Sequence, residues 1–536
     1  MDKTSFYPWQ IAAFRRLEGR SGVLSAPTGS GKTWVAYLWT GLIDTDGQGH
    51  QPRRPVIFTA PIKALSNERY MDLRRMGFDV GIETGDFKKN EGASIICCTQ
   101  EIYTMKYAGR PGITLVIDEF HYIFDDPDRA RSYIDGIRLT HPDSPVLVMS
   151  ATFGGAEKVG RYLKRLTGRP FELYESQERA TKLLYKPRTP LTASRIKDAL
   201  VFVFSQRGAA ELAELIAAER PLIDEEGRKR LDDLAAILQV DSLAPPLERG
   251  IGIYHGGMLP KEKLLVESAF RERILDVVVG TNALALGVNL PAETVVFGQL
   301  VRYHDRRPIS KNEFLQMAGR AGRKGLFDRG FVTWFKNSPC ESRGTDTGAA
   351  FRKLLKNPPE KAAVTLRPEY GKLLREEIAV DEEARYIARF SLPNSDVRLV
   401  EEELRSGLRK IAKAVRRLVP ASQRQRFRLI LADLWYGEMD IDENLEMAIL
   451  FHLRERPQAM TAAEVLEPFE RNYLQALLKV KRFANRLPQG YAFDGLAELN
   501  DAVEAIDPTI YGFEEKLDEI EGDSGEGLSF ADEKGE

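Results

Sequence analysis

The sequence predicts an α/β protein with two tandem domains built on parallel sheets, followed by a mainly helical C-terminal domain. Two observations support this prediction. Before about residue 340, short β-branched apolar runs alternate with amphipathic stretches, a pattern typical of strands buried on both faces of a parallel sheet. After Arg343 these runs stop, and apolar residues recur with helical spacing, as at Leu404, Leu408 and Ile411.

The apolar runs divide the chain into domains. Eight of them have the length of strands and are bounded by Gly, Pro or polar residues: 22–25, 56–58, 94–98, 115–117, 146–149, 201–204, 275–279 and 294–297. These are too many for one ordinary sheet, and the polar stretch 175–195 contains turn-forming Lys-Pro and Thr-Pro pairs. We therefore place a linker there. The predicted domains are 1–178, 190–338 and a helical domain at 345–513, with an acidic disordered tail at 514–536.

Composition narrows the function. The 77 Lys and Arg residues nearly balance 79 Asp and Glu residues, and the net charge of −2 excludes binding of nucleic acid through a global positive field. No apolar run approaches the roughly 18 residues of a membrane span, and the N-terminal segment lacks the apolar core of a secretory signal. Cys97, Cys98 and Cys340 have no paired spacing, which predicts reduced thiols in a cytoplasmic protein.

A nucleotide site is indicated by the segment APTGSGKT at 26–33, which follows a short strand and precedes a helical stretch. Its glycines let backbone N–H groups close around phosphate at the helix N-terminus. Lys32 is expected to reach the β- and γ-phosphates, and Thr33 to hold Mg²⁺. The residues expected to bind ATP are Pro27, Thr28, Gly29, Ser30, Gly31, Lys32 and Thr33.

The segment LVIDE at 115–119 supplies the acidic half of the same site. An apolar strand that ends in an acid places a carboxylate at the carboxyl edge of the sheet, beside the phosphate loop. Asp118 is expected to bind Mg²⁺, directly or through water, and Glu119 to orient and polarise the attacking water.

Further motifs resemble those of a known family. The segments DEFH at 118–121, SAT at 150–152 and QMAGRAGR at 316–323 resemble superfamily 2 helicases of the DExH form, which have two RecA-like domains. A finer similarity, to the superkiller-type RNA helicases that feed RNA to the exosome, rests on APIKALSN at 60–67, TGD at 84–86, TQEI at 99–102, GIGIYHGGMLP at 250–260 and GVNLPA at 287–292. The resemblance covers residues 1 to about 338.

The resemblance implies roles for particular residues. Gln10 is similar to the glutamine that contacts adenine. Gln316, Arg320 and Arg323 are implied to reach the γ-phosphate from the second domain, the arginines acting as fingers on the charge of the transition state. The residues implied to couple the nucleotide state to strand movement are His121, Ser150, Ala151 and Thr152.

The same resemblance implies a path for a single strand across the tops of both sheets. Such a path binds phosphates mainly, through backbone N–H groups, hydroxyls and a few cations. Each candidate taken alone also fits ordinary turn chemistry. The candidates are Lys63, Thr84, Gly85 and Thr99 in the first domain and Gln206, Arg207, Gly256, Gly257 and Thr281 in the second.

A basic stretch at 404–430 holds nine Lys or Arg residues and no acid. Arg405, Arg409 and Lys413 share one helical stripe, which fits either a ratchet helix that offers cations to the exiting strand, as the family implies, or a solvated amphipathic helix. Only about 200 residues follow the last motif. They are too few for the winged-helix domain, large helical bundle and arch of the family, so we expect a reduced C-terminal domain without an arch.

These observations predict an ATP- and Mg²⁺-dependent helicase that moves 3′ to 5′ on single-stranded RNA. Two alternatives stay open: a DNA helicase of the same subgroup, because phosphate contacts read the sugar weakly, and a module that remodels or recruits nucleic acid without unwinding it. A monomer without membrane association is expected, and no protein partner is indicated.

Overall fold

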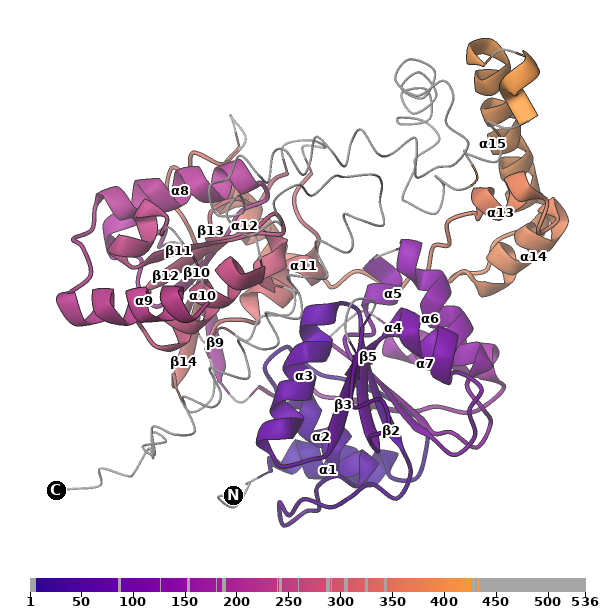
Figure 1. Cartoon of the computed structure of the whole chain (residues 1–536), viewed down its shortest axis with the longest axis horizontal. Coiled ribbons are helices and arrows are strands. Elements are labelled where there is room, and N and C mark those ends of the chain that lie inside the picture. Colours follow the sequence, from indigo (N-terminus) through magenta and orange to yellow (C-terminus); the bar gives the residue numbers. More distant parts are fainter. Residues whose placement is uncertain are drawn as a thin grey trace, which may run out of the picture.

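The computed structural model describes residues 6–84, 88–125, 127–151, 155–179, 181–185, 189–238, 240, 243–258, 260–285, 290, 292–302, 307–322, 326–341, 345–419, 421–425, 428 and 432. They form two α/β domains. Figure 1 shows the second beside the first, with residues 370–390 lying next to the first domain and the long last helix extending away from it. Within these ranges, no helix combines the length and the apolar character needed to cross a bilayer.

The first sheet has eight strands in the order β4-β3-β5-β2-β6-β7-β1-β8, and every pairing is parallel except β3 with β4. The strands β1, β2, β5, β6 and β7 are buried along their whole length, because helices cover both faces of the sheet. The strands are β1 (Gly22–Ser25), β2 (Val56–Ala60), β3 (Val80–Glu83), β4 (Lys88–Lys89), β5 (Ile95–Thr99), β6 (Thr114–Ile117), β7 (Val146–Ser150) and β8 (Glu172–Glu175).

Helices cover the two faces of this sheet in separate layers. One face packs on α1 (Pro8–Leu17), α2 (Lys32–Thr40) and α3 (Lys63–Arg75). The other face packs on α5 (Tyr122–Asp125), α6 (Pro127–Leu139) and α7 (Ala156–Thr167), together with the short turn formed by α4 (Gln100–Ile102) and a π-helical turn at Tyr103–Tyr107.

The second sheet has six strands in the order β11-β12-β10-β13-β14-β9, all parallel. They are β9 (Lys182–Tyr185), β10 (Ala199–Phe202), β11 (Ile251–Tyr254), β12 (Val277–Gly280), β13 (Thr294–Phe297) and β14 (Arg329–Trp334). One face packs on α8 (Gln206–Ala218). The other packs on α9 (Glu225–Ile237), α10 (Pro260–Arg271), α11 (Lys311–Ala318) and α12 (Thr347–Lys356).

The region after the second sheet divides between the two domains. Phe351 of α12 is fully buried against Phe297, Phe314 and Trp334, so this helix completes the core of the second domain. The next helices, α13 (Tyr370–Arg375), α14 (Val380–Phe390) and α15 (Val397–Leu418), share a core with the first domain.

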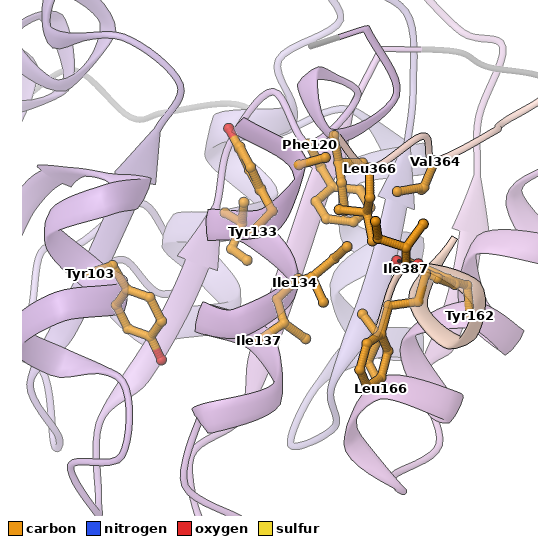
Figure 2. Packing of buried hydrophobic residues seen from close by; sticks show 14 of the residues in the cluster. Tyr103, Phe120, Tyr133, Ile134, Ile137, Tyr162, Leu166, Val364, Leu366 and Ile387 are labelled. Carbon is orange, nitrogen blue, oxygen red and sulfur yellow. Dashed lines mark hydrogen bonds between the residues drawn. The ribbon is translucent and has the colours of Figure 1, made fainter. Parts of the chain in front are cut away.

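Apolar and polar contacts hold α14 on the first domain. Figure 2 shows Val364, Leu366 and Ile387 in one cluster with Phe120 and Tyr162 of the first domain. At the edge of this cluster, the Tyr162 hydroxyl donates to Phe390 O at 2.6 Å. Arg131 of α6 also pairs with the buried carboxylate of Glu383, at 2.5 Å. The C-terminal region therefore contacts both domains rather than standing apart from them.

The predicted fold class is confirmed, and the differences lie at its edges. The predicted linker at 175–195 contains β9, which pairs with β14 and starts the second sheet at Lys182. This edge strand has no fully buried residue, so it lacks the apolar signature of the central strands. Cys97 and Cys98 are buried in β5 as expected. The predicted domain up to 513 lies mostly outside the described residues, and the predicted acidic tail lies wholly outside them.

Candidate active site

The phosphate loop joins the end of β1 to the start of α2. Gly29 and Gly31 have φ angles of 74° and 90°, in the left-handed region where a side chain strains the backbone. A Cβ at Gly31 would also lie 2.6 Å from Gln10 Nε2. Because Gly31 is the N-cap of α2, the loop presents a helix N-terminus with its N–H groups and its partial positive charge.

Gln10 lies at the end of this loop, where its predicted contact with adenine requires it. The Tyr7 backbone N–H donates to Gln10 Oε1 at 2.8 Å, and Gln10 Nε2 donates to Gly31 O at 3.0 Å. Phe6 stands edge-on to Trp34 beside it, with ring centroids 6.2 Å apart. The amide is thereby fixed between α1 and the phosphate loop.

Lys32 is held inside the loop by its own backbone. Its Nζ donates to Ala26 O at 3.0 Å and to Pro27 O at 3.3 Å. Burial lowers the pKa of Lys32, while the nearby carboxylates of Glu119 and Asp118 act in the opposite direction. Among the described residues, the Lys32 ammonium therefore bonds to two carbonyl oxygens. It can exchange these carbonyls for phosphate oxygens when a nucleotide binds to the N–H groups of the loop.

Asp118 directly follows β6. Its carboxylate is bonded to Arg69, a residue that the motifs did not single out. Arg69 of α3 donates through Nη2 to Asp118 Oδ2 at 2.9 Å and to Thr33 Oγ1 at 3.2 Å. Its Nη1 donates to the Tyr37 hydroxyl at 3.0 Å. One cationic nitrogen thus bridges the two oxygen atoms expected to hold Mg²⁺. A hydroxyl and a carboxylate are hard oxygen donors of the kind that Mg²⁺ prefers, so the residues fit this ion.

Glu119 lies at the centre of the site in a constrained backbone. Its φ of 47° is left-handed, which is unusual for a residue with a side chain and is common at functional positions. Burial by itself raises the pKa of Glu119, but the nearby His121, Lys32 and Arg320 lower it more, so the pKa ends below its ordinary value. The group is therefore a carboxylate at neutral pH.

The Ser30 hydroxyl oxygen and Glu119 Oε2 make no hydrogen bond among the described residues, although Glu119 Oε2 lies 3.3 Å from His121 Nδ1. Buried polar atoms are nearly always satisfied, so unpaired ones point to a missing partner. A polyphosphate at the loop and a water beside Glu119 would supply these partners. The donor set therefore fits a nucleoside triphosphate with Mg²⁺.

His121 connects this carboxylate to the second domain. Its Nδ1 lies 3.3 Å from Glu119 Oε2 and 3.4 Å from the Ser150 hydroxyl, while its Nε2 lies 3.4 Å from Gln316 Nε2. Gln316 and Ala151 line a cavity of about 260 Å³ next to the phosphate cleft rather than the cleft itself. The structure thus places Gln316 of the second domain against His121 of the first. A movement of the second domain would change this contact. Thr152 lies outside the described residues.

The second domain forms the opposite wall of the cleft, which has a volume of about 670 Å³. Arg320 lines it together with Leu290, Gly319 and Gly322, and the Arg320 guanidinium donates to Ala285 O within its own domain. Arg323 lies outside the described residues. One predicted finger is therefore placed at the cleft, held by a backbone carbonyl.

The predicted nucleic-acid contacts gather at one edge of each sheet. In parallel sheets the carboxyl ends of all strands meet at the same edge, where ligands bind in open α/β folds. Thr84, Thr99 and Thr281 lie at the ends of β3, β5 and β12, and all three are buried. The structure thus brings the candidates to the expected edges, and their roles stay predictions. Gly85 lies outside the described residues.

The other candidates on these edges are more open. Lys63 begins α3, and Gln206 begins α8. Arg207 has an 88% exposed side chain and pairs with Glu211 at 2.6 Å. Gly256 and Gly257 form the turn after β11, and a Cβ at Gly257 would lie 2.8 Å from Gln206 Nε2. This turn therefore packs closely on the start of α8.

The predicted basic stripe lies on α15. Arg405, Arg409 and Lys413 are exposed there, and Arg405 is bonded to Glu401 of the same helix at 2.7 Å. The opposite face is buried, with Leu404 and Ile411 in the core shared with the first domain. A Cβ at Gly407 would overlap the Tyr370 hydroxyl, so the helix contacts α13 closely.

Motif reasoning missed two arginines of the cleft. Arg69 lies two residues after the segment at 60–67, on the same helix, and Arg179 lies in the connection between the sheets. Arg179 donates to Gly319 O and Ala321 O across the domain boundary. Neither residue belongs to a spacing pattern, because their partners come from distant parts of the chain.

The fold and site together define a class of protein. A phosphate loop, an acidic strand end beside it and a second sheet-containing domain that brings an arginine to the cleft are the parts of a nucleoside triphosphatase with two RecA-like domains. Comparison with known proteins is consistent with that class. Residues 7–159 match the DEAD/DEAH box helicase family and residues 192–325 match the helicase conserved C-terminal domain, together more than half of the chain.

Individual relatives narrow the family. The chain is 28% identical over 410 residues to the ATP-dependent RNA helicase mtr4 of Schizosaccharomyces pombe, covering 61% of this chain and 36% of that protein. It is 28% identical over 407 residues to the exosome RNA helicase MTR4 of Homo sapiens, covering 61% and 38%. It is 29% identical over 434 residues to the probable helicase HelY of Mycobacterium tuberculosis, covering 64% and 47%.

The chain belongs to the superfamily 2 DExH helicases, in the superkiller-type subgroup. The matched part spans less than half the length of these curated relatives.

Proposed function

We propose that this chain is an ATP-dependent RNA helicase that hydrolyses ATP between its two RecA-like domains. One observation carries the proposal: a single cleft is lined by Lys32, Asp118 and Glu119 from one domain and by Arg320 from the other. Hydrolysis that needs residues from both walls is coupled to the relative position of the domains, and a motor requires this coupling.

The residues of the first domain bind and activate. The N–H groups of the phosphate loop bind the β- and γ-phosphates. Lys32 also binds them, and in doing so it exchanges the loop carbonyls that now accept its hydrogen bonds for phosphate oxygens. Mg²⁺, when bound with ATP, neutralises phosphate charge. Thr33 and Asp118 would hold it, and Arg69 would have to release them first.

Glu119 orients the attacking water through its carboxylate, whose Oε2 makes no hydrogen bond among the described residues and lies 3.3 Å from His121 Nδ1. The water oxygen forms a bond to the γ-phosphorus while the bond from that phosphorus to the bridging oxygen breaks, and the water proton moves toward the carboxylate or a phosphate oxygen. Arg320 approaches from the second domain and stabilises the charge that develops on the transferred group. The contact between His121 and Gln316 lies beside this centre and would change when the domains move.

The substrate proposed is single-stranded RNA, moved 3′ to 5′. This choice is supported by the printed descriptions of the mtr4 relatives as RNA helicases and by the candidate contacts at the carboxyl edges of both sheets. Phosphate contacts there would grip a strand without reading its bases.

The test is an ATPase assay with single-stranded RNA or DNA as activator, followed by unwinding of duplexes that carry a 3′ or a 5′ tail. We expect stimulation by RNA and unwinding from a 3′ tail. Stimulation by DNA alone would reject RNA as the substrate. Stimulation without unwinding of either duplex would favour the remodelling module over the helicase.

A further inference from the structure

The connection between the two sheets carries an arginine that lines the cavity next to the cleft and bonds to the turn of the second domain. Arg179 lies between Glu175, where β8 ends, and Lys182, where β9 begins. Its Nη2 donates to Gly319 O at 3.1 Å and to Ala321 O at 2.9 Å, and its Nε donates to Thr181 O at 3.3 Å. The arginine therefore holds both sides of the turn from which Arg320 projects.

The same guanidinium lies close to the phosphate loop. A Cβ placed on Gly29 would lie 3.2 Å from Arg179 Nη2 and 3.5 Å from Gly319 O. A Cβ on Gly319 would lie 2.6 Å from Thr28 Cβ. The loop and the turn thus approach each other through glycines, and Arg179 lies at their junction. A shift of the phosphate loop would therefore displace the turn that carries Arg320.

The charge of Arg179 is not balanced by a carboxylate. Its hydrogen bonds go to three carbonyl oxygens, and in the described part of the chain it forms no ion pair. Burial lowers the pKa of Arg179, and its charge in turn helps to lower the pKa of Lys32. Arg69, in contrast, has Asp118 as its partner at 2.9 Å. A buried cation without an anion is costly, and the adjacent loop is the place where phosphate would bring negative charge.

We propose that Arg179 is a positioning residue for hydrolysis, which sets the turn carrying Arg320 against the phosphate loop when nucleotide phosphates balance its charge. This inference rests on the proposed ATPase function and deepens it. ATP brings one more negatively charged phosphate group to this loop than ADP does. The arginine therefore favours the triphosphate over the diphosphate and transmits that preference to the turn.

The chain offers a matched control in Arg169. This arginine also donates to three carbonyl oxygens, those of His141, Pro142 and Ser144, and burial lowers its pKa as well. It lines neither the cleft nor the adjacent cavity, whereas Arg179 lines that cavity together with His121 and Gln316. Arg169→Met therefore removes a similar network without touching the nucleotide site.

The experiment compares Arg179→Met, Arg179→Lys and Arg169→Met in the full chain. Their kcat and KM for ATP are measured, together with affinities for ADP and for a non-hydrolysable ATP analogue by titration calorimetry. For Arg179→Met we expect kcat to fall by roughly 10- to 100-fold, as for other misplaced catalytic groups. Its preference for the analogue over ADP should also shrink, while ADP affinity stays within about twofold. Arg179→Lys, which keeps the charge, should recover part of both losses.

Several results would overturn the inference. They are an unchanged kcat in Arg179→Met, an equal loss in Arg169→Met, or a parallel loss of ADP affinity that marks a disturbed phosphate loop. If the unaltered chain does not hydrolyse ATP, the proposed function fails. The ratio of analogue to ADP affinity still tests Arg179 in that case, and an unchanged ratio in Arg179→Met would reject its role.

Discussion

The cations of the cleft and the cations of α15 stand in opposite surroundings. In and beside the cleft, the buried Lys32 and the half-buried Arg179 are bonded to backbone carbonyls, and Arg69 is bonded to Asp118. On α15, Arg409 and Lys413 point into solvent. The first group is held in fixed positions by its partners, whereas the second is free to follow a mobile ligand.

This difference predicts how each group acts. A buried charge in a fixed geometry interacts strongly and specifically, because little water screens it. Exposed charges contribute little individually, add up roughly, and weaken as salt increases. Substitutions in the cleft should therefore change chemistry or nucleotide binding by large factors, and substitutions on α15 should change only the salt dependence of strand binding.

The largest effect is expected for Glu119→Gln. The amide keeps the shape of the side chain but cannot attract the proton of the attacking water, so kcat should fall by about 10²- to 10⁴-fold. Because Glu119 does not hold the phosphates, the affinity for the ATP analogue should stay near that of the unaltered chain. A steady-state ATPase assay with a parallel binding titration measures both. Residual hydrolysis above a tenth of the normal rate would contradict this role. It would mean that Glu119 lowers the activation free energy by less than about 1.4 kcal/mol.

The next effect is expected for Arg69→Met. Its side chain and that of Asp118 are only 15% and 20% exposed, and removing one partner of a buried ion pair costs about 3–5 kcal/mol. Thermal unfolding without Mg²⁺ should therefore begin at a lower temperature than in the unaltered chain. Since Mg²⁺ can take the place of the lost cation, its addition should raise the unfolding temperature more in the variant. Equal responses to Mg²⁺ would show that Arg69 does not occupy the ion's position.

Lys32→Ala should weaken nucleotide binding. The ammonium is placed to exchange two carbonyl partners for phosphate oxygens, and removal of such a buried charge costs at least about 2 kcal/mol, or roughly 30-fold in Kd. Titration with ADP measures this change. Lys63→Ala serves as a comparison, because Lys63 begins a helix of the same domain but is absent from the lining of the cleft. Equal Kd values for ADP in the two variants would show that Lys32 does not bind the phosphates.

The smallest effect is expected for the double variant Arg409→Ser, Lys413→Ser. If these cations bind the exiting strand, removing each cation that pairs with a phosphate should reduce the slope of log affinity against log salt by about 0.7 for a single strand. Binding of a single-stranded RNA at several salt concentrations measures this slope. The matched control is Lys158→Ser, Lys164→Ser, which removes two exposed cations of α7. Identical slopes in the two double variants would support the interpretation of α15 as a solvated amphipathic helix.

Part of the fold was predictable because it is written in local patterns. The runs that became β2, β6, β7 and β13 are fully buried, so their apolar, β-branched composition identifies them. The edge strand β9 is only partly buried and has no β-branched residue in its sequence KLLY, so it escapes this criterion. The predicted start of the helical domain at 345 also ignored α12, whose apolar face fills the second core.

The candidate site divides in the same way. The phosphate loop was predictable because a strand, a tight turn and a helix follow one another directly at 22–40. Asp118 and Glu119 were predictable because they follow an apolar strand, and the carboxyl ends of parallel strands meet at one edge of the sheet. The resemblance implied that Gln316 reaches the γ-phosphate and that Gln10 contacts adenine, and both roles stay predictions. It did not anticipate the contacts of Gln316 with His121 and of Gln10 with Gly31.

The sequence by itself determined that this chain has two α/β domains and a phosphate loop with acids beside it, because hydrophobic period and motif spacing act over a few residues. Only the tertiary structure decided that Arg69 bridges Thr33 and Asp118 and that Arg179 bonds to the turn that carries Arg320. Those contacts join residues 36, 49 and 140 positions apart. Contacts over such separations depend on the order of the strands in the sheets and on how the domains dock. No local sequence spacing therefore predicts them.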